Sequence, residues 1–276
     1  MNDECYMNEK MNAYALSHIG NSRENHEDNY LLGGQYLSPE QVKTLTLTKK
    51  THTEKMNTFG EFCVAVSDGM GGYECGEIAS LLTVSYLSDH YNEFLEQVKN
   101  NKENIVDIVR NLNAYICNEA RKKTETRNMG ATLCGVFVFE DIAYGFNVGD
   151  SRLYRYDGYD LKQISVDNTE GQRLLDLGLL TKEEVASFPN KKAIYKYIGK
   201  EVELIPDIYE LGSISKNELL LLCSDGLSDV IEREEIQDML SKEHISTEDK
   251  GKFLVEMAVE RKANAGDNIT LIIIER

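Results

Sequence analysis

An apolar run that ends in a carboxylate and a glycine turn is the strongest local constraint on this chain. Residues 62–66, Phe-Cys-Val-Ala-Val, favour a buried strand. Ser67 and Asp68 follow, and then residues 69–72, Gly-Met-Gly-Gly, whose glycines permit a tight turn. Apolar residues recur at helical spacing from 73 to 91. Asp68 is therefore expected between a strand and a helix, although an Asp-Gly pair by itself is more often a turn than a ligand site.

Three further aspartates stand beside a glycine at the edge of a strand-like run. They are Asp150, Asp225 and Asp267, which lie after the runs 142–148 and 218–224 and before the run 269–274. If these strands belong to one sheet system, their carboxylates can gather at one edge, where they repel one another unless cations lie between them. Hard cations such as Mg²⁺ or Mn²⁺ prefer such oxygen ligands. Spacing alone leaves open whether the carboxylates converge.

A dense polar cluster precedes the strand-like run at 30–32. It contains Arg23, Glu27 and Asp28, so a guanidinium and two carboxylates stand near the start of a strand. The planar fork of Arg23 suits phosphate oxygens. The alternative interpretation is a polar hairpin tip with a surface ion pair of little energetic weight. His26 lies in the same cluster, where a supporting or solvent-facing role is a simpler interpretation than proton transfer.

The rest of the chain alternates between strand-like and helical patterns. We expect strands at 13–19, 132–139, 142–148, 153–156, 203–211, 218–224 and 269–274, and helices near 104–123, 233–241 and 247–262. Residues 34–58 favour a solvated insertion with a small hairpin or helical turn, and 167–200 favour short helical pieces. A capping-box pattern stands at Thr181 to Glu184. No repeat or linker divides the chain, so we expect a single domain over 1–276.

Charge and cysteine usage narrow the functional classes. The net charge of −17 opposes binding to nucleic acid or anionic membranes and suits cation binding. The six cysteines have no C-x-x-C spacing and several lie in apolar runs, so we expect buried thiols in a reducing compartment and no zinc site. The N-terminus has no signal-peptide pattern, and no apolar run approaches the roughly 18 residues that span a bilayer. We therefore expect a cytoplasmic protein.

In their order along the chain, the motifs resemble those of the metal-dependent protein phosphatases, also called protein phosphatase 2C, in their bacterial branch. The resemblance runs from about residue 12 to the C-terminus and rests on Arg23-x-x-x-Glu27-Asp28, Asp68-Gly69-Met70-Gly71-Gly72, Gly130-Ala131-Thr132, Val148-Gly149-Asp150-Ser151-Arg152, Ser224-Asp225-Gly226-Leu227-Ser228-Asp229 and Gly266-Asp267-Asn268. It implies an α+β fold, an α-β-β-α sandwich of two antiparallel sheets flanked by helices. It also implies a small flap subdomain at about 167–200.

The same resemblance implies a function and a set of site residues. Such enzymes hydrolyse phosphoserine and phosphothreonine in proteins by attack of a water or hydroxide that bridges two Mn²⁺ or Mg²⁺ ions. The residues carried over are Asp68 as the shared ligand of the two ions, the Gly69 carbonyl, Asp225 and Asp267 at the first ion, Glu27 and Asp28 around the second, Asp150 with Asp225 at a weaker third site, and Arg23 as the phosphate clamp. Ser151, Arg152, Asp229 and Asn268 are expected to support the loops.

Met70 departs from the family pattern, because many eukaryotic relatives have a His there that is proposed as general acid. Protonation of the leaving group is then expected from water at the metals. The implied partners are phosphorylated targets of a serine/threonine kinase in a signalling role, with no nucleic acid or membrane, and we expect a monomer. Two alternatives stay open: a non-catalytic module of the same fold that senses phosphoproteins, and a metal-dependent nuclease or other phosphodiesterase, against which the acidic charge weighs.

Overall fold

The computed structural model describes residues 10–71, 75–140, 142–261 and 266–276. The first sheet contains β1 (Met11–His18), β4 (His52–Thr58), β9 (Arg152–Tyr156), β10 (Leu161–Gln163), β12 (Leu219–Cys223) and β13 (Ile269–Glu275). The second contains β2 (Asp28–Leu32), β3 (Gln35–Tyr36), β5 (Phe62–Met70), β6 (Gly130–Ala131), β7 (Leu133–Phe139), β8 (Ile142–Val148) and β11 (Asp207–Ser213). The helices are α1 (Pro39–Thr48), α2 (Gly76–Asp89), α3 (Tyr91–Asn100), α4 (Asn104–Ala120), α5 (Glu170–Asp176), α6 (Lys182–Ser187), α7 (Asp225–Ser228), α8 (Arg233–Leu240) and α9 (Thr247–Arg261).

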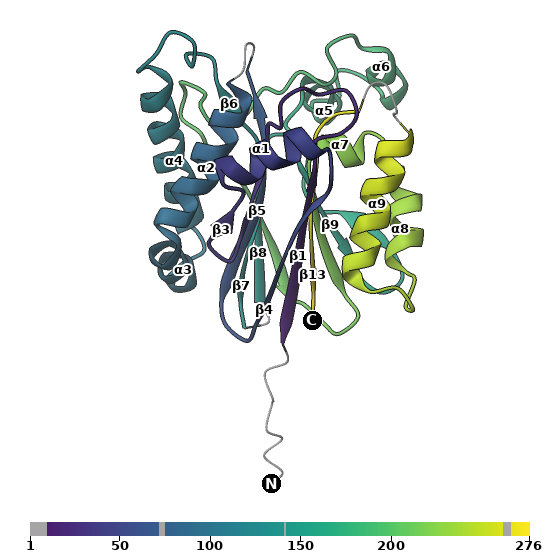
Figure 1. Cartoon of the computed structure of the whole chain (residues 1–276). Helices are drawn as coiled ribbons and strands as arrows, with labels where there is room; N and C mark the ends of the chain where they lie inside the picture. Colours follow the sequence, from purple (N-terminus) through teal and green to yellow (C-terminus); the bar gives the residue numbers. More distant parts are fainter. Residues whose placement is uncertain (1–9, 72–74, 141, 262–265) are drawn as a thin grey trace.

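The two sheets face each other, with helices on both outer sides (Figure 1). The strand order is β10-β9-β12-β13-β1-β4 in one sheet and β11-β8-β7-β5-β2-β3 in the other, with β6 paired to the end of β5. Neighbouring strands run antiparallel throughout these pairings. This arrangement confirms the predicted α-β-β-α sandwich.

The central strands are apolar over consecutive residues because both faces of each sheet are covered. Phe62, Val64 and Val66 of β5 lie in the core between the sheets, whereas Cys63 and Ala65 lie in the core under α2, α3 and α4. Strands β12 and β13 alternate in the same way between the core that separates the sheets and the core under α8 and α9. The ends of β5 and β12 are therefore held at a spacing that the apolar layer between them determines.

The segment 34–58 differs from the expected solvated insertion. It forms α1 and the edge strand β4, which pairs with β1 over its whole length. Helix α1 begins at a capping box of Ser38 and Gln41, with Pro39 in its first turn. Strand β4 alternates between partly buried and exposed residues, which explains its polar sequence. A second difference is α3, an additional helix that begins after His90.

Other sequence predictions agree with the structure in part. The pieces α5 and α6 are short helices, and α6 begins at the capping box of Thr181 and Glu184. The strand expected at 203–211 is displaced and runs from 207 to 213. Five cysteines are buried and form no disulfide: Cys63, Cys75, Cys117, Cys134 and Cys223; Cys5 lies outside the described residues. None of the described helices combines the length and the apolar character needed to cross a membrane.

Candidate active site

Asp68 and Asp28 stand side by side at one end of the second sheet. Their Cα atoms are paired in the register of β5 and β2. Asp28 is almost fully buried, whereas Asp68 is partly exposed. The backbone of Asp68 is fixed by Thr132, because Asp68 N donates to Thr132 Oγ1 at 2.9 Å and Thr132 N donates to Asp68 O at 2.8 Å. The position of the Asp68 carboxylate is thus determined by strand pairing as well as by its own rotamer.

The first sheet brings Asp225 to the same place. Ser224 follows β12 and donates its hydroxyl to Asp28 Oδ2 at 2.7 Å, so it connects the ends of the two sheets. Asp225 is the next residue and begins α7. Asp28 Oδ1 and Asp225 Oδ1 are both buried and accept no hydrogen bond from the described residues. Buried acceptors without donors are suited to a bound cation.

Burial and mutual repulsion raise the pKa values of the carboxylate cluster, by which we mean Asp28, Asp68, Asp150 and Asp225. Burial is the largest cause for each of the four carboxyls. The pKa is raised to about 7 for Asp28 and Asp150 and to about 6 for Asp225. The pKa of Asp68 is raised well above its usual value, by burial first and then by the charges of Asp28, Asp225 and Asp150. The fold therefore brings four of the predicted carboxylates within electrostatic reach of one another.

Asp267 lies near the carboxylate cluster but faces Arg23. Arg23 Nε donates to Asp267 Oδ1 and Arg23 Nη2 donates to Asp267 Oδ2, each at 2.7 Å. These hydrogen bonds are the largest cause of the raised pKa of Arg23. Arg23, the predicted phosphate clamp, and Asp267, a predicted metal ligand, are thus bound to each other. The sequence predictions did not name Asp267 as the partner of Arg23, because 244 positions separate the two residues.

Glu27 and the Gly69 carbonyl approach each other around Gly76 at the start of α2. A Cβ on Gly76 would lie 2.7 Å from the Glu27 carboxyl carbon and 2.7 Å from Gly69 O, so this position requires glycine. Burial raises the pKa of Glu27, Arg23 opposes the change, and Glu77 raises the pKa further. Glu77 is a nearby carboxylate that the sequence predictions missed. The sequence feature that could have identified Glu77 is its place as an acidic residue in the first turn of the helix after the glycine turn.

His26 and Asn268 support the loop that carries Glu27. His26 is 1% exposed, its Nε2 lies 2.8 Å from Ser17 Oγ, and burial lowers its pKa to about 3. At neutral pH the imidazole is therefore uncharged and shielded from solvent, which argues against proton transfer. Asn268 Oδ1 accepts a hydrogen bond from Glu27 N at 2.6 Å, and Asn268 Nδ2 donates to Ile19 O at 2.8 Å.

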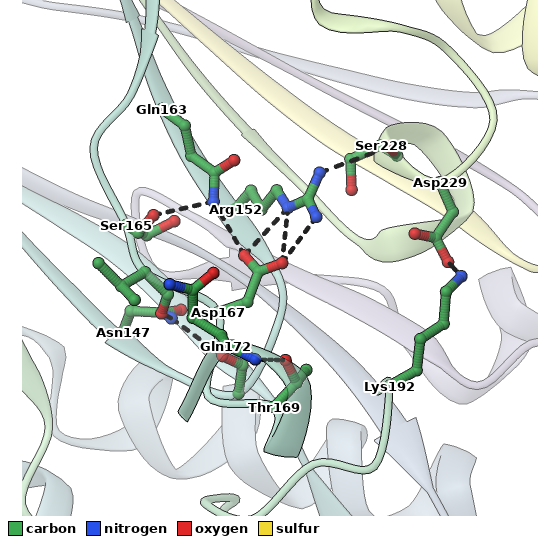
Figure 2. A network of polar contacts seen from close by, with 12 residues as sticks. Asn147, Arg152, Gln163, Ser165, Asp167, Thr169, Gln172, Lys192, Ser228 and Asp229 are labelled. Atoms are coloured by element: carbon green, nitrogen blue, oxygen red, sulfur yellow. Dashed lines mark hydrogen bonds and ion pairs between the residues drawn. The ribbon is translucent and has the colours of Figure 1, made fainter. Parts of the chain in front are cut away.

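A second polar network borders Asp150 on the side of α5 and α6 (Figure 2). Arg152 donates three hydrogen bonds to the Asp167 carboxylate, at 2.6, 3.0 and 3.1 Å. Lys192, which follows α6, forms an ion pair with Asp229 at the end of α7. Both cations in this network are therefore already matched by a carboxylate.

Hard divalent cations fit the chemistry of this donor set. The available groups are carboxylate oxygens and one backbone carbonyl. Two of the buried oxygens have no donor in the part of the chain that the structure describes, and the carboxyl pKa values are raised. Within the described ranges, no three His, Cys, Asp or Glu side chains already form a group that could hold a metal ion. The assignment of individual ligands to individual ions is accordingly part of the proposal below.

A family model described as protein phosphatase 2C matches residues 52–263, which is more than half of the chain. The chain belongs to the protein phosphatase 2C family. The protein phosphatase PhpP of Streptococcus pneumoniae is 30% identical over 220 residues, which cover 79% of this chain and 87% of PhpP. A solved serine/threonine phosphatase of S. agalactiae is 25% identical, with a TM-score of 0.78 and coverage of 96% of this chain and 99% of that one. The catalytic domain of the serine/threonine protein phosphatase PstP, solved with two manganese ions, is also 25% identical, with a TM-score of 0.72 and coverage of 97% and 99%.

Without metal, this protein phosphatase 2C chain is expected to become less stable as the pH rises from about 4 to 7. The folded cluster retains protons on Asp28, Asp150 and Asp225, at pKa values of about 6 to 7, that the unfolded chain releases near pH 4. Stability that depends on these protons is present below the unfolded pKa and is lost as the pH passes the folded pKa. The melting temperature in chelator should therefore be lower at pH 8 than at pH 5.5.

Added Mn²⁺ should raise the melting temperature more at pH 8 than at pH 5.5, because the metal then competes with fewer protons. An Asp28→Asn variant removes one of the repelling carboxylates, so its melting temperature in chelator should vary less with pH. An equal or higher melting temperature at pH 8 for the unchanged chain in chelator would contradict the clustering of these carboxylates.

Proposed function

We propose that this serine/threonine protein phosphatase depends on divalent metal ions held at the end of the two sheets. The observation that carries the proposal is the meeting of Asp28 and Asp68 from one sheet with Asp225 from the other, in which two buried carboxylate oxygens have no donor among the described residues. The family and the named serine/threonine phosphatases support the reaction class. The manganese ions in the PstP structure support the choice of metal.

The residues that would hold two Mn²⁺ or Mg²⁺ ions are those that the motifs imply. They are Asp68, the Gly69 carbonyl, Asp225 and Asp267 for the first ion, Asp68 with Glu27 and Asp28 for the second, and Asp150 with Asp225 for a weaker third. When bound, such ions lower the pKa of water and neutralise charge that develops on the phosphoryl group.

Arg23 would orient the phosphate, and Met70 supplies no side-chain proton for the leaving group. Arg23 presents a planar fork to the site, and its pairing with the two oxygens of Asp267 supports a role in binding a bidentate anion in this place. If Asp267 served as a metal ligand, that fork would be available to hold two oxygens of the phosphate monoester. Met70, directly beyond Gly69 on β5, has no proton to donate, and we assign protonation of the leaving alkoxide to water.

We take residues 1–276 to form one catalytic domain in which 167–200 is the flap. Its substrates would be phosphoproteins made by a serine/threonine kinase in a signalling role. We further propose that it acts as a monomer in the cytoplasm, without a nucleic-acid or membrane partner. The acidic charge of −17 supports the last of these statements.

The purified chain is expected to release phosphate from a phosphothreonine peptide when Mn²⁺ or Mg²⁺ is present and to stop when a chelator is added. Addition of excess Mn²⁺ after the chelator should restore the rate, which shows that the chelator removed metal and did not denature the chain. Phosphate release that persists in chelator would remove the role of the metals. Metal binding and tight phosphopeptide binding without turnover would instead support the non-catalytic sensing module.

A further inference from the structure

We propose that a groove beside the candidate active site binds a negatively charged side chain of the substrate, located a few residues from the phosphorylated one. This inference rests on the proposed phosphatase function and concerns which phosphoproteins the site prefers. The groove, called here the Arg127 groove, has a volume of about 680 Å³ and is lined mainly by Arg121, Arg127, Asn128, Met129, Tyr197 and Glu201.

The Arg127 groove lies at the same end of the sheets as Asp68. Strand β6 pairs with the end of β5, with Gly130 opposite Met70, and Figure 1 shows β6 near the end of the sandwich where α5 and α6 lie. A Cβ on Gly71 would lie 3.4 Å from Met129 Cα and 3.5 Å from Asn128 O. The wall of the groove thus lies beside Gly71, three residues after Asp68, which is about 10 Å along an extended chain. An extended peptide crosses that distance in about three residues.

Both walls of the groove are fixed by the backbone. Ala131 N donates to Ile198 O at 3.0 Å, and Ile198 N donates to Ala131 O at 2.8 Å, so the segment after α6 is joined to β6. A Cβ on Gly130 would lie 2.7 Å from the Tyr197 ring, so the glycine allows this ring to pack against the strand. A groove with fixed walls binds a side chain without first having to order itself.

Arg127 is the cation that this groove makes available to a ligand. Its side chain is exposed and, across the described ranges, has no hydrogen bond or ion pair within the protein. Arg121 is paired with Glu201 at 3.0 Å. On the opposite side of the site, Arg152 and Lys192 are paired with carboxylates, as Figure 2 shows. A negatively charged side chain of a bound peptide would therefore be attracted to Arg127.

The local charge supports an anionic partner. Residues 121–127 contain four basic residues and one acidic residue in a chain with a net charge of −17. Lys122 forms an ion pair with Glu119 of α4, so part of this basic segment is explained by the neighbouring end of that helix. Arg127 lies beyond the reach of that explanation. The net negative charge of the protein disfavours the binding of acidic peptides in general. A positive surface beside the site would offset this repulsion and favour peptides with an acidic residue at the matching position.

The test uses phosphothreonine peptides of one neutral sequence, assayed with Mn²⁺. One peptide is unchanged, one has Glu three residues before the phosphothreonine, and one has Glu three residues after it. We expect kcat/KM to be about three- to tenfold higher for one of the Glu peptides than for the neutral peptide, as an exposed charge-assisted contact implies. A fourth peptide with a second phosphothreonine at the better position distinguishes a phosphate from a carboxylate as the preferred group.

Arg127→Gln should bring the kcat/KM of the acidic and neutral peptides to within about twofold of each other, while Arg127→Lys should keep part of the preference. The matched control is Lys123→Gln, which removes one positive charge from the same segment outside the groove and should keep the full preference. Equal kcat/KM for the neutral and both Glu peptides would overturn the inference and leave the phosphatase function intact. Equal loss of preference in Lys123→Gln would also overturn it, and hydrolysis of none of the peptides would remove both the inference and the proposed function.

Discussion

Asp68→Asn is expected to hydrolyse a phosphothreonine peptide on the order of 10²–10³-fold more slowly than the unchanged chain, even with Mn²⁺ in excess. Asparagine has nearly the shape of aspartate but lacks the charge that a shared ligand of two cations supplies. Because Thr132 fixes the backbone of this residue, the variant should keep its place in β5. Steady-state kinetics over a range of Mn²⁺ concentrations, with calorimetric titration of Mn²⁺, would measure the effect.

The same substitution should raise the melting temperature of the chain in chelator. Burial and the charges of Asp28 and Asp225 oppose ionisation of Asp68, so a neutral side chain relieves that repulsion. Opposite effects on activity and on stability distinguish a lost ligand from a misfolded protein. Asp176→Asn is the matched control, because Asp176 is an exposed residue of α5 and its substitution should change neither quantity. Full activity of Asp68→Asn at saturating Mn²⁺ would contradict the role of Asp68 as a shared ligand.

Gly226→Ala is expected to lower the free energy of unfolding by about 2–3 kcal/mol and to weaken Mn²⁺ binding. A Cβ on Gly226 would lie 1.9 Å from Asn268 O and 2.9 Å from Asn268 C. These are backbone atoms of the segment that precedes β13, so the clash cannot be relieved by rotating a side chain. Helix α7 would have to move, and Asp225 is its first residue. Urea unfolding and calorimetric titration of Mn²⁺ would measure the two effects.

Gly60→Ala is the control for this substitution. Gly60 is exposed, and the nearest atom to an added Cβ is Thr58 Oγ1 at 3.5 Å, which is an ordinary contact. The free energy of unfolding should change by less than about 1 kcal/mol. If Gly226→Ala were as stable as Gly60→Ala, the glycine after Asp225 would serve some purpose other than the close approach of two backbones.

Sequence patterns predicted the fold where apolar periodicity was strong. The run at 62–66 gave β5, and the continuous apolar residues of β12 and β13 follow from their burial on both faces. Strand β4 escaped prediction because an edge strand needs few apolar residues and is placed by its pairing with β1, which is distant in the sequence. Helix α1 had a readable signal, since Ser38, Pro39 and Gln41 form a proline-containing capping box. That local signal outweighs the polar composition that suggested a solvated insertion.

The sequence predicted which carboxylates come together but not the pairings around them. An Asp next to a Gly at each strand edge singled out Asp68, Asp150 and Asp225, and the order of the motifs implied a common site. No sequence pattern indicated that Arg23 would bind Asp267 or that Ser224 would join the two sheets through Asp28, because these contacts depend on the relative placement of distant strands. That Arg127 has no side-chain partner among the described residues is likewise a property of the folded surface, visible only when neighbouring cations are matched with their carboxylates.

The two halves of the sandwich each contribute carboxylates to the proposed metal site, so residues outside that site also bear on it. Val66 on one sheet and Ile272 on the other lie in the apolar layer that separates the halves. The thickness of that layer sets the distance between the ends of the two sheets, where the carboxylates lie. Metal coordination distances tolerate deviations of only about 0.2 Å. If the site binds metal as proposed, the volume of interior side chains would tune its cation affinity, and changes in the core sequence among relatives would alter that affinity while every carboxylate stays unchanged.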